Sequence, residues 1–111
     1  MTVTVNALIP LKLAENSQTN QYTAVDCKAI IDKFTGTNVS AGNVVVSVNL
    51  CVQGDAESSA NLAVSAKSIA PGETYLFPEL VGQCVTNGGY ISTICNTPAA
   101  LVISASGREV T

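Results

Sequence analysis

Apolar and polar side chains alternate along one segment of the chain, from Val44 to Val52. Its even-numbered positions are all valine or leucine, whereas its odd-numbered positions include Ser47, Asn49 and Cys51. Successive side chains of a strand point to opposite faces, so a period of two indicates a half-buried antiparallel strand. We therefore expect a strand here whose even-numbered face lies on the core of a β-protein.

Turn residues divide the last third of the chain, residues 69–109, into short apolar segments. The main breaks are Pro71-Gly72 and Asn87-Gly88, the latter followed by another glycine. Pro-Gly is favoured at the centre of a type II turn, and Asn-Gly between apolar segments is typical of a hairpin. We therefore expect a type II turn over 70–73, and a hairpin that joins a strand over 80–85 to one over 90–95.

The remaining segments with strand-like patterns are also short. In one of them we expect Ile30 and Phe34 on one face and Ile31 on the other, and in another we expect Leu62, Val64 and Ala66 to face inward. In chain order, these segments are Thr2–Lys12 around Pro10, Tyr22–Ala24, Ala29–Phe34, Leu62–Lys67, Thr74–Phe77 and Leu101–Ala105.

No window longer than about ten residues has a helical period. About seven to nine short strands with frequent turns predict an all-β fold, an antiparallel β-sandwich of jelly-roll type. An immunoglobulin-like sandwich is the alternative, although the chain has no tryptophan for the signature of that fold. The 111 residues correspond to a single domain over 1–111.

Charged residues are scarce. They make up 12% of the chain, against about 25% in ordinary globular domains. A surface of serine, threonine, asparagine and small apolar groups is easy to desolvate, and interface cores are depleted in charge, so we expect a homo-oligomer. The net charge is −3 and the five basic residues are scattered, which argues against nucleic acid as a partner.

The first residues have neither the basic start nor the long apolar stretch of a secretion signal. No segment approaches the roughly 20 apolar residues that a membrane helix needs. We therefore expect a protein made in the cytoplasm that does not interact with a membrane.

The four cysteines are Cys27, Cys51, Cys84 and Cys95. An even number invites a disulfide interpretation, but a reducing cytosol favours free thiols, which pack well as small apolar groups. Free buried thiols are the first expectation, and one or two disulfides remain the alternative.

The chain offers little chemistry for catalysis. It has no histidine, which is the usual general base and the commonest transition-metal ligand. A zinc site usually needs a closely spaced pair of cysteines, which the chain lacks. A calcium site needs more oxygen ligands than the two loop carboxylates, Asp55 and Glu57, supply. We therefore expect no enzymatic activity, no catalytic residue, no metal and no cofactor.

Loops and edges carry binding more often than cores do, so three segments are candidate partner contacts. They are the N-terminal arm over 2–13, the loop over 53–59 and the turn over 71–74. The candidate contact residues are Val3, Val5, Leu8, Asp55, Glu57, Pro71, Gly72 and Glu73.

Several segments carry a family likeness. They are Lys28–Asp32, Thr37–Gly42, Val44–Val48, Ala60–Leu62, Ile69–Thr74, Leu80–Gly82, Gly88–Ile91 and Ala105–Glu109. Together they resemble small β-sandwich virion proteins of tailed bacteriophages and prophages. The four cysteines depart from that pattern, which has aliphatic or small residues in their place.

The resemblance implies a structural protein of the virion, with the major capsid protein or the neck and tail proteins as partners. Capsid decoration, or cementing, is the leading expectation. A neck, tail or fibre-attachment accessory protein is the first alternative. A carbohydrate-binding module is the second alternative, since lectins also use jelly rolls, although aromatic residues make up only 5% of the chain.

Overall fold

The computed structural model describes residues 2–111, which form nine strands and one turn of 3-10 helix, η1. The elements are β1 (Val3–Leu13), β2 (Thr19–Thr23), β3 (Lys28–Asn38), β4 (Val44–Cys51), η1 (Ser59–Asn61), β5 (Leu62–Ile69), β6 (Thr74–Tyr75), β7 (Cys84–Val85), β8 (Tyr90–Cys95) and β9 (Leu101–Val110).

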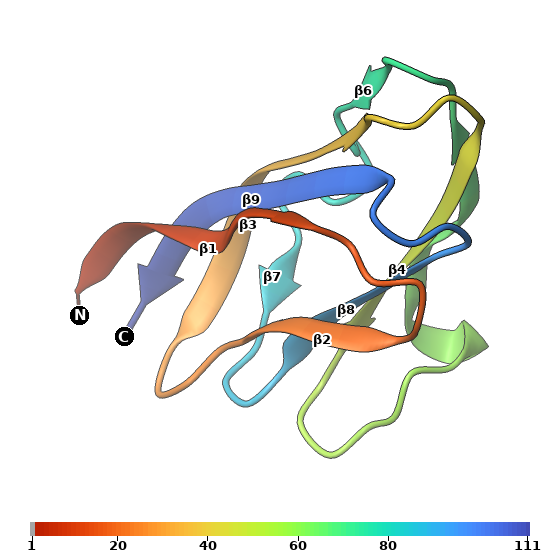
Figure 1. Cartoon of the computed structure of the whole chain (residues 1–111). Helices are drawn as coiled ribbons and strands as arrows, with labels where there is room; N and C mark the ends of the chain where they lie inside the picture. Colours follow the sequence, from red (N-terminus) through yellow and green to blue (C-terminus); the bar gives the residue numbers. More distant parts are fainter. Residues whose placement is uncertain (1) are drawn as a thin grey trace.

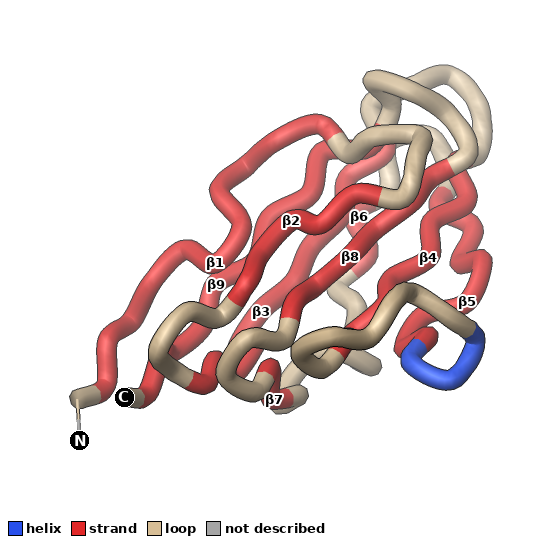
Figure 2. Tube along the Cα trace, turned by 90° about the horizontal axis from the view of Figure 1, so that it is seen from below, coloured by secondary structure: helices blue, strands red, loops and turns tan. Residues whose placement is uncertain are grey.

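The strands form two antiparallel sheets that pack face to face (Figures 1 and 2). One sheet, here called sheet A, has the order β1-β9-β3-β6, and β7 also pairs with β3. The other, sheet B, has the order β2-β8-β4-β5. The predicted antiparallel β-sandwich is therefore confirmed. The sheet order does not decide between a jelly-roll and an immunoglobulin-like arrangement.

Sheet B confirms the period of two in β4. Val44, Val46 and Val48 are at most 1% exposed and face sheet A. Two of the predicted inward-facing side chains are exposed, one just after β4 and one within β5. Val52 is 52% exposed because the chain leaves the sheet after Cys51. Ala66 is exposed at a β-bulge, where its φ of 50° turns the strand.

A second bulge corrects the predicted faces of β3. The pairing with β9 shifts between Ile31 and Lys33, so Ile31 and Phe34 both lie in the core and Ile30 points to the outer face. A bulge inserts one residue and thereby reverses the alternation beyond it. At this bulge the Ile30 carbonyl approaches Gly107 of β9, and a Cβ on Gly107 would lie 2.1 Å from that oxygen.

The turn at Asn87 and Gly88 is not a hairpin, which corrects another prediction. The strand before it, β7, pairs with β3 in sheet A, whereas the strand after it, β8, belongs to sheet B. The turn therefore carries the chain from one sheet to the other. Two backbone hydrogen bonds hold this turn against Ala24. The Ala24 C=O accepts from Gly88 N–H at 2.8 Å, and the Ala24 N–H donates to Gly89 C=O at 2.9 Å. A Cβ on Gly89 would lie 2.7 Å from the Cys51 carbonyl oxygen.

We predict that Gly107→Ala lowers the free energy of unfolding by about 3 kcal/mol or more, because the new methyl group must push β3 away from β9. Equilibrium urea unfolding measures this. Gly42→Ala is the matched control, since no atom lies within 4 Å of its Cβ position. We expect the control to stay within about 0.5 kcal/mol of the native chain. Equal stability of the two variants would contradict the account of the bulge.

Candidate functional site

The N-terminal segment is an edge strand. β1 pairs along its length with β9 and has no strand on its other side within residues 2–111. Val3 is 52% exposed and Val5 80% exposed, so both candidate contacts lie at the surface. Leu8 is 4% exposed and packs in the core, so its side chain does not reach the surface and it leaves the set of contact residues. The pairing shifts after Ala7, which turns Leu8 and Ile9 inward.

The second candidate segment, the loop after β4, folds back over the outer face of sheet B. Asp55 is exposed, and its backbone carbonyl accepts a hydrogen bond from the Tyr90 hydroxyl. Glu57 is half-buried and accepts a hydrogen bond from the Ser92 hydroxyl at 2.6 Å. This bond is the main reason that the pKa of Glu57 is lowered. Asp55 is therefore available to a partner, whereas Glu57 also holds its own loop.

The side chain of Asn49, on β4, holds the same loop against the outer face of sheet B. Its side chain is 4% exposed, and its Nδ2 donates to the Ser58 carbonyl at 2.9 Å and to Asn61 Oδ1 at 2.7 Å. Gln18 reaches over from the segment before β2 and donates to Ser92 Oγ at 2.7 Å. These bonds explain why a polar residue on the outer face of β4 is buried. The alternation of β4 indicates that Asn49 points outward, but the sequence does not show that a loop covers it.

Two shallow hollows lie on the outer face of sheet B, and the larger one is bordered by this loop. Their volumes are about 300 and 280 Å³, and Ser47 and Ile94 line both. Every buried side-chain nitrogen and oxygen in the described part of the chain has a hydrogen-bond partner. The two amides that line the larger hollow, Gln18 and Asn49, are also hydrogen-bonded to other residues of the chain. This geometry favours a structural role for the polar groups.

The third candidate segment is the type II turn that the Pro-Gly pair predicts, and the structure confirms it. Gly72 has a φ of 76°, and Glu73 N–H donates to Ala70 C=O at 3.0 Å. The Glu73 carboxylate accepts from Ala70 N–H at 2.8 Å. Pro71, Gly72 and Glu73 are all exposed.

The buried amide of Asn38 holds the turn that follows β3, which lies beside the type II turn. Its Nδ2 donates to the carbonyls of Gly42 and Ile69, each at 2.8 Å, and its Oδ1 accepts from the backbone and side chain of Ser40. Gly72 N–H donates to the Asn38 carbonyl at 2.9 Å, so both turns are tied to the end of β3. The turn over 70–73 is therefore a rigid, exposed projection.

The structure does not bring the three segments together. β4 runs from Val44, opposite Ile69, to Cys51, opposite Tyr90. The loop after Cys51 and the turn after Ile69 therefore lie at opposite ends of the sandwich. Figure 2 shows β1 and η1 on opposite sides of the molecule, so the N-terminal edge is separate from the loop that contains η1. The chain presents three distinct surfaces.

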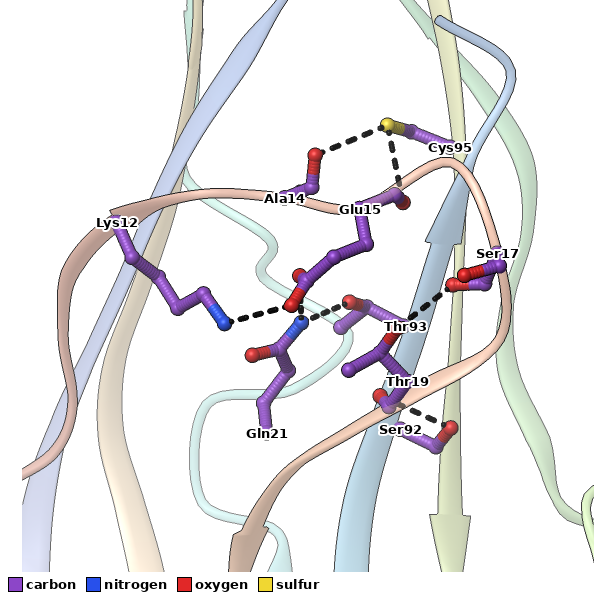
Figure 3. A network of polar contacts seen from close by, with 9 residues as sticks. All are labelled: Lys12, Ala14, Glu15, Ser17, Thr19, Gln21, Ser92, Thr93 and Cys95. Atoms are coloured by element: carbon purple, nitrogen blue, oxygen red, sulfur yellow. Dashed lines mark hydrogen bonds and ion pairs between the residues drawn. The ribbon is translucent and has the colours of Figure 1, made fainter. Parts of the chain in front are cut away.

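A polar network fixes the connection where the chain crosses from β1 to β2 (Figure 3). Glu15 accepts from Lys12 Nζ at 3.0 Å and from Gln21 Nε2 at 2.8 Å, and Gln21 also donates to Thr93 Oγ1 at 3.0 Å. The bond from Gln21 is the largest cause of the lowered pKa of Glu15. The sequence does not reveal this network, because Thr93 is 72 residues away from Gln21 along the chain.

A second network joins the edge strand to both sheets. Glu109 of β9 accepts from Asn6 Nδ2 of β1 at 2.8 Å and from the Tyr22 hydroxyl of β2 at 2.6 Å. The hydrogen bond from Tyr22 is the main reason that the pKa of Glu109 is lowered. Burial, followed by the bond to Glu109, raises the pKa of Tyr22. This network ties β1 to sheet B as well as to its own sheet.

All four cysteines are free thiols. Cys27, Cys51 and Cys95 are buried, as expected for small apolar groups, but Cys84 is exposed on β7. Burial raises the pKa of Cys51 and of Cys95, which leaves these thiols less reactive than an exposed one.

Within residues 2–111, histidine, cysteine, aspartate and glutamate side chains form no group of three that suits a metal ion. The described residues also contain no helix with the length and apolar character needed to cross a membrane. Comparison with known proteins gave no matching family model, no matching curated protein and no matching solved structure. The resemblance to phage virion proteins therefore stays a prediction.

The Glu109 network predicts a pH dependence of stability. A carboxylate whose pKa is lower in the folded chain stabilises the fold above its unfolded pKa, near 4.5, and this contribution is lost as the pH falls through the folded pKa. We expect Glu109→Gln to lose about 1 kcal/mol at neutral pH. It should also show a smaller further loss on acidification than the native chain.

Urea unfolding at a series of pH values between neutral and acid measures both effects. Part of the acid sensitivity should persist in the variant, because the pKa values of Glu15 and Glu57 are lowered too. Asp55→Asn, the same acid-to-amide change at an exposed position, is the control and should stay within about 0.5 kcal/mol of the native chain at neutral pH. Identical profiles for Glu109→Gln and the native chain would contradict the prediction.

The Asn49 anchor predicts a local effect on the loop over 52–61. Asn49→Ala removes two hydrogen bonds to this loop, so we expect a loss of about 1–3 kcal/mol and faster proteolytic cleavage within the loop. Asn20→Ala is the control, since Asn20 is exposed and bonds only locally, to Thr23. Cleavage of the loop at the native rate in Asn49→Ala would show that the loop is held by other contacts.

Proposed function

We propose that the chain is a structural protein of a tailed-phage virion, most specifically a capsid decoration protein. In this role many copies bind the outside of a capsid and stabilise contacts between neighbouring capsid subunits. The major capsid protein is the principal partner, and the protein is made in the host cytoplasm before it joins the virion. The role requires neither a catalytic residue nor a cofactor.

The separation of the candidate contact segments is the observation that carries this proposal. A protein that clamps two neighbours needs a contact surface for each of them. The loop over 52–61 and the turn over 70–73 lie at opposite ends of a sandwich whose longest dimension is 45 Å. The turn is held by hydrogen bonds to Asn38 and the loop by hydrogen bonds to Asn49, so both bind without a large ordering cost.

The character of the surface supports the same role. Several large apolar side chains are exposed, and charges are few, so much of the surface loses little free energy when a partner excludes water. Apolar area buried in such contacts contributes about 25 cal/mol per Å² before the cost of association. The exposed apolar side chains are Val3, Val5, Leu11, Leu13, Val25, Val39, Val52, Leu76 and Val81.

The copy number in purified virions tests the proposal. Quantitative mass spectrometry should find hundreds of copies of this chain per particle, in fixed proportion to the major capsid protein. About a dozen copies or fewer would favour the neck, tail or fibre-attachment alternative, in which closed cyclic symmetry is expected. Absence of the chain from the particle would overturn both, and binding to a glycan array would then support the carbohydrate-binding alternative.

Charge removal at each end of the sandwich tests the contact surfaces. We expect Asp55→Asn and Glu73→Gln each to weaken binding to undecorated particles several-fold and to reduce its salt dependence. Both variants keep the shape of the side chain, and the glutamine retains an acceptor for Ala70 N–H. Glu79→Gln, exposed but outside the candidate segments, is the control. Binding that is unaffected at both ends would remove these segments from the interface.

A further inference from the structure

The first half of β1 is an unprotected sheet edge. Residues 2–8 carry no charged side chain, and Val3 and Val5 are exposed. Such an edge offers unpaired backbone groups to another strand, and natural proteins usually block it with charge, proline, bulges or very short strands. In β1 these devices come only after Ala7, where the pairing shifts and Pro10 and Lys12 follow.

The other three edges of the sandwich are blocked. β6 and β7, at the far side of sheet A, have two residues each. β5 has a bulge at Ala66 followed by Lys67, and β2 has five residues with a shift in pairing after Asn20. The first half of β1 is the exception among the edges of the described chain.

The direction of the backbone groups along this edge follows from one hydrogen bond. Thr111 N–H donates to the Thr2 carbonyl at 3.0 Å, so the backbone of Thr2 faces β9. Antiparallel pairs alternate, and the register is unbroken from Val3 to Ala7. The backbones of Thr4 and Asn6 therefore also face β9, whereas the N–H and C=O groups of Val3, Val5 and Ala7 point away from the sheet.

We propose that this segment, Val3–Ala7, pairs antiparallel with the same segment of a second copy across a two-fold axis at Val5. In that register Val5 lies opposite the second Val5, and Val3 lies opposite Ala7. Each outward-facing N–H and C=O then meets its counterpart, which gives about six backbone hydrogen bonds. The two copies of sheet A become one continuous sheet.

The side chains of the segment suit pairing with itself. Val3 and Val5 share one face with Ala7, so the pairing sets valine against valine and valine against alanine. Thr4 lies opposite Asn6 on the other face. No charge meets a like charge, because Arg108, the partner of Val5 on β9, is held by Asp32 at 2.9 Å. The shift in pairing after Ala7 then ends the contact and fixes its register.

Sedimentation velocity of the purified full-length chain tests the pairing. The native chain should sediment as a monomer–dimer equilibrium that shifts toward dimer with concentration. Val5→Pro removes the N–H at the centre of the contact but leaves the ladder to β9 intact, since that N–H faces away from β9. We expect its dimer dissociation constant to rise at least tenfold. Val5→Ala, which keeps the N–H, is the control and should retain most of the dimer.

A mixing experiment tests the register without relying on proline. In a two-fold contact centred at residue 5, Val5→Lys places two ammonium groups opposite each other, and Val5→Glu does the same with two carboxylates. Each variant alone should be monomeric. An equimolar mixture should recover a dimer, because opposite charges then meet across the axis.

A native chain that stays monomeric up to its solubility limit would overturn the proposal. So would a mixture of Val5→Lys and Val5→Glu that forms no dimer, while a dimer unaffected by Val5→Pro would place the contact elsewhere. These outcomes are independent of the proposed virion role, since a monomeric chain can still decorate a capsid, and a dimer can form in a protein that does not.

Discussion

The pairing of β9 with strands on both of its sides is the constraint on which the rest of the structure depends. β9 pairs with β1 from Val3 to Leu13 and with β3 from Lys28 to Asn38, so the last strand of the chain joins the first strand to the sandwich. This arrangement requires close approach at Gly107, where the Ile30 carbonyl occupies the space of a side chain. Glu109, two residues after Gly107, accepts a hydrogen bond from Tyr22 of β2 and so links β9 to sheet B. The N-terminal edge is therefore positioned by residues at the opposite end of the sequence.

Hydrogen bonds between neutral side chains and a few carboxylates take the place that ion pairs have in more charged proteins. Two salt bridges, Lys12–Glu15 and Asp32–Arg108, occur in the described residues, and both are partly exposed. Exposed pairs of this kind contribute little. The half-buried carboxylates of Glu57 and Glu109 instead accept from hydroxyls and an amide, which satisfies them without a second charge. The connections between strands are thus fixed while the surface remains nearly neutral.

Sequence patterns predict the parts of this fold that depend on near neighbours. The alternation of β4 and the type II turn at Pro71 and Gly72 follow from local geometry, and both are present. The faces of β3 could not be predicted, because its bulge lies against Gly107 of β9. Gly107 pairs with Ile31 but is more than 70 residues away from it along the chain. The path of the chain after Asn87 depends on whether β7 pairs with β8 or with β3, which the Asn-Gly turn alone does not decide. Among the contact residues, exposure follows from loop position for Asp55 and Pro71, whereas the burial of Leu8 depends on the shift in β1.

Scarcity of charge links the fold to the assembly that we propose. A β-sandwich with open edges stays monomeric when charged or irregular residues occupy those edges. Here three edges are irregular or short, and the fourth is straight, neutral and lined by exposed valines over its first half. The same shift in pairing that turns Leu8 and Ile9 into the core ends this open segment. Leu8 and Ile9, which anchor β1 in the core, therefore also mark where the open part of the edge ends. The same shift in pairing contributes to the stability of the fold and limits the length of edge that can pair with another strand.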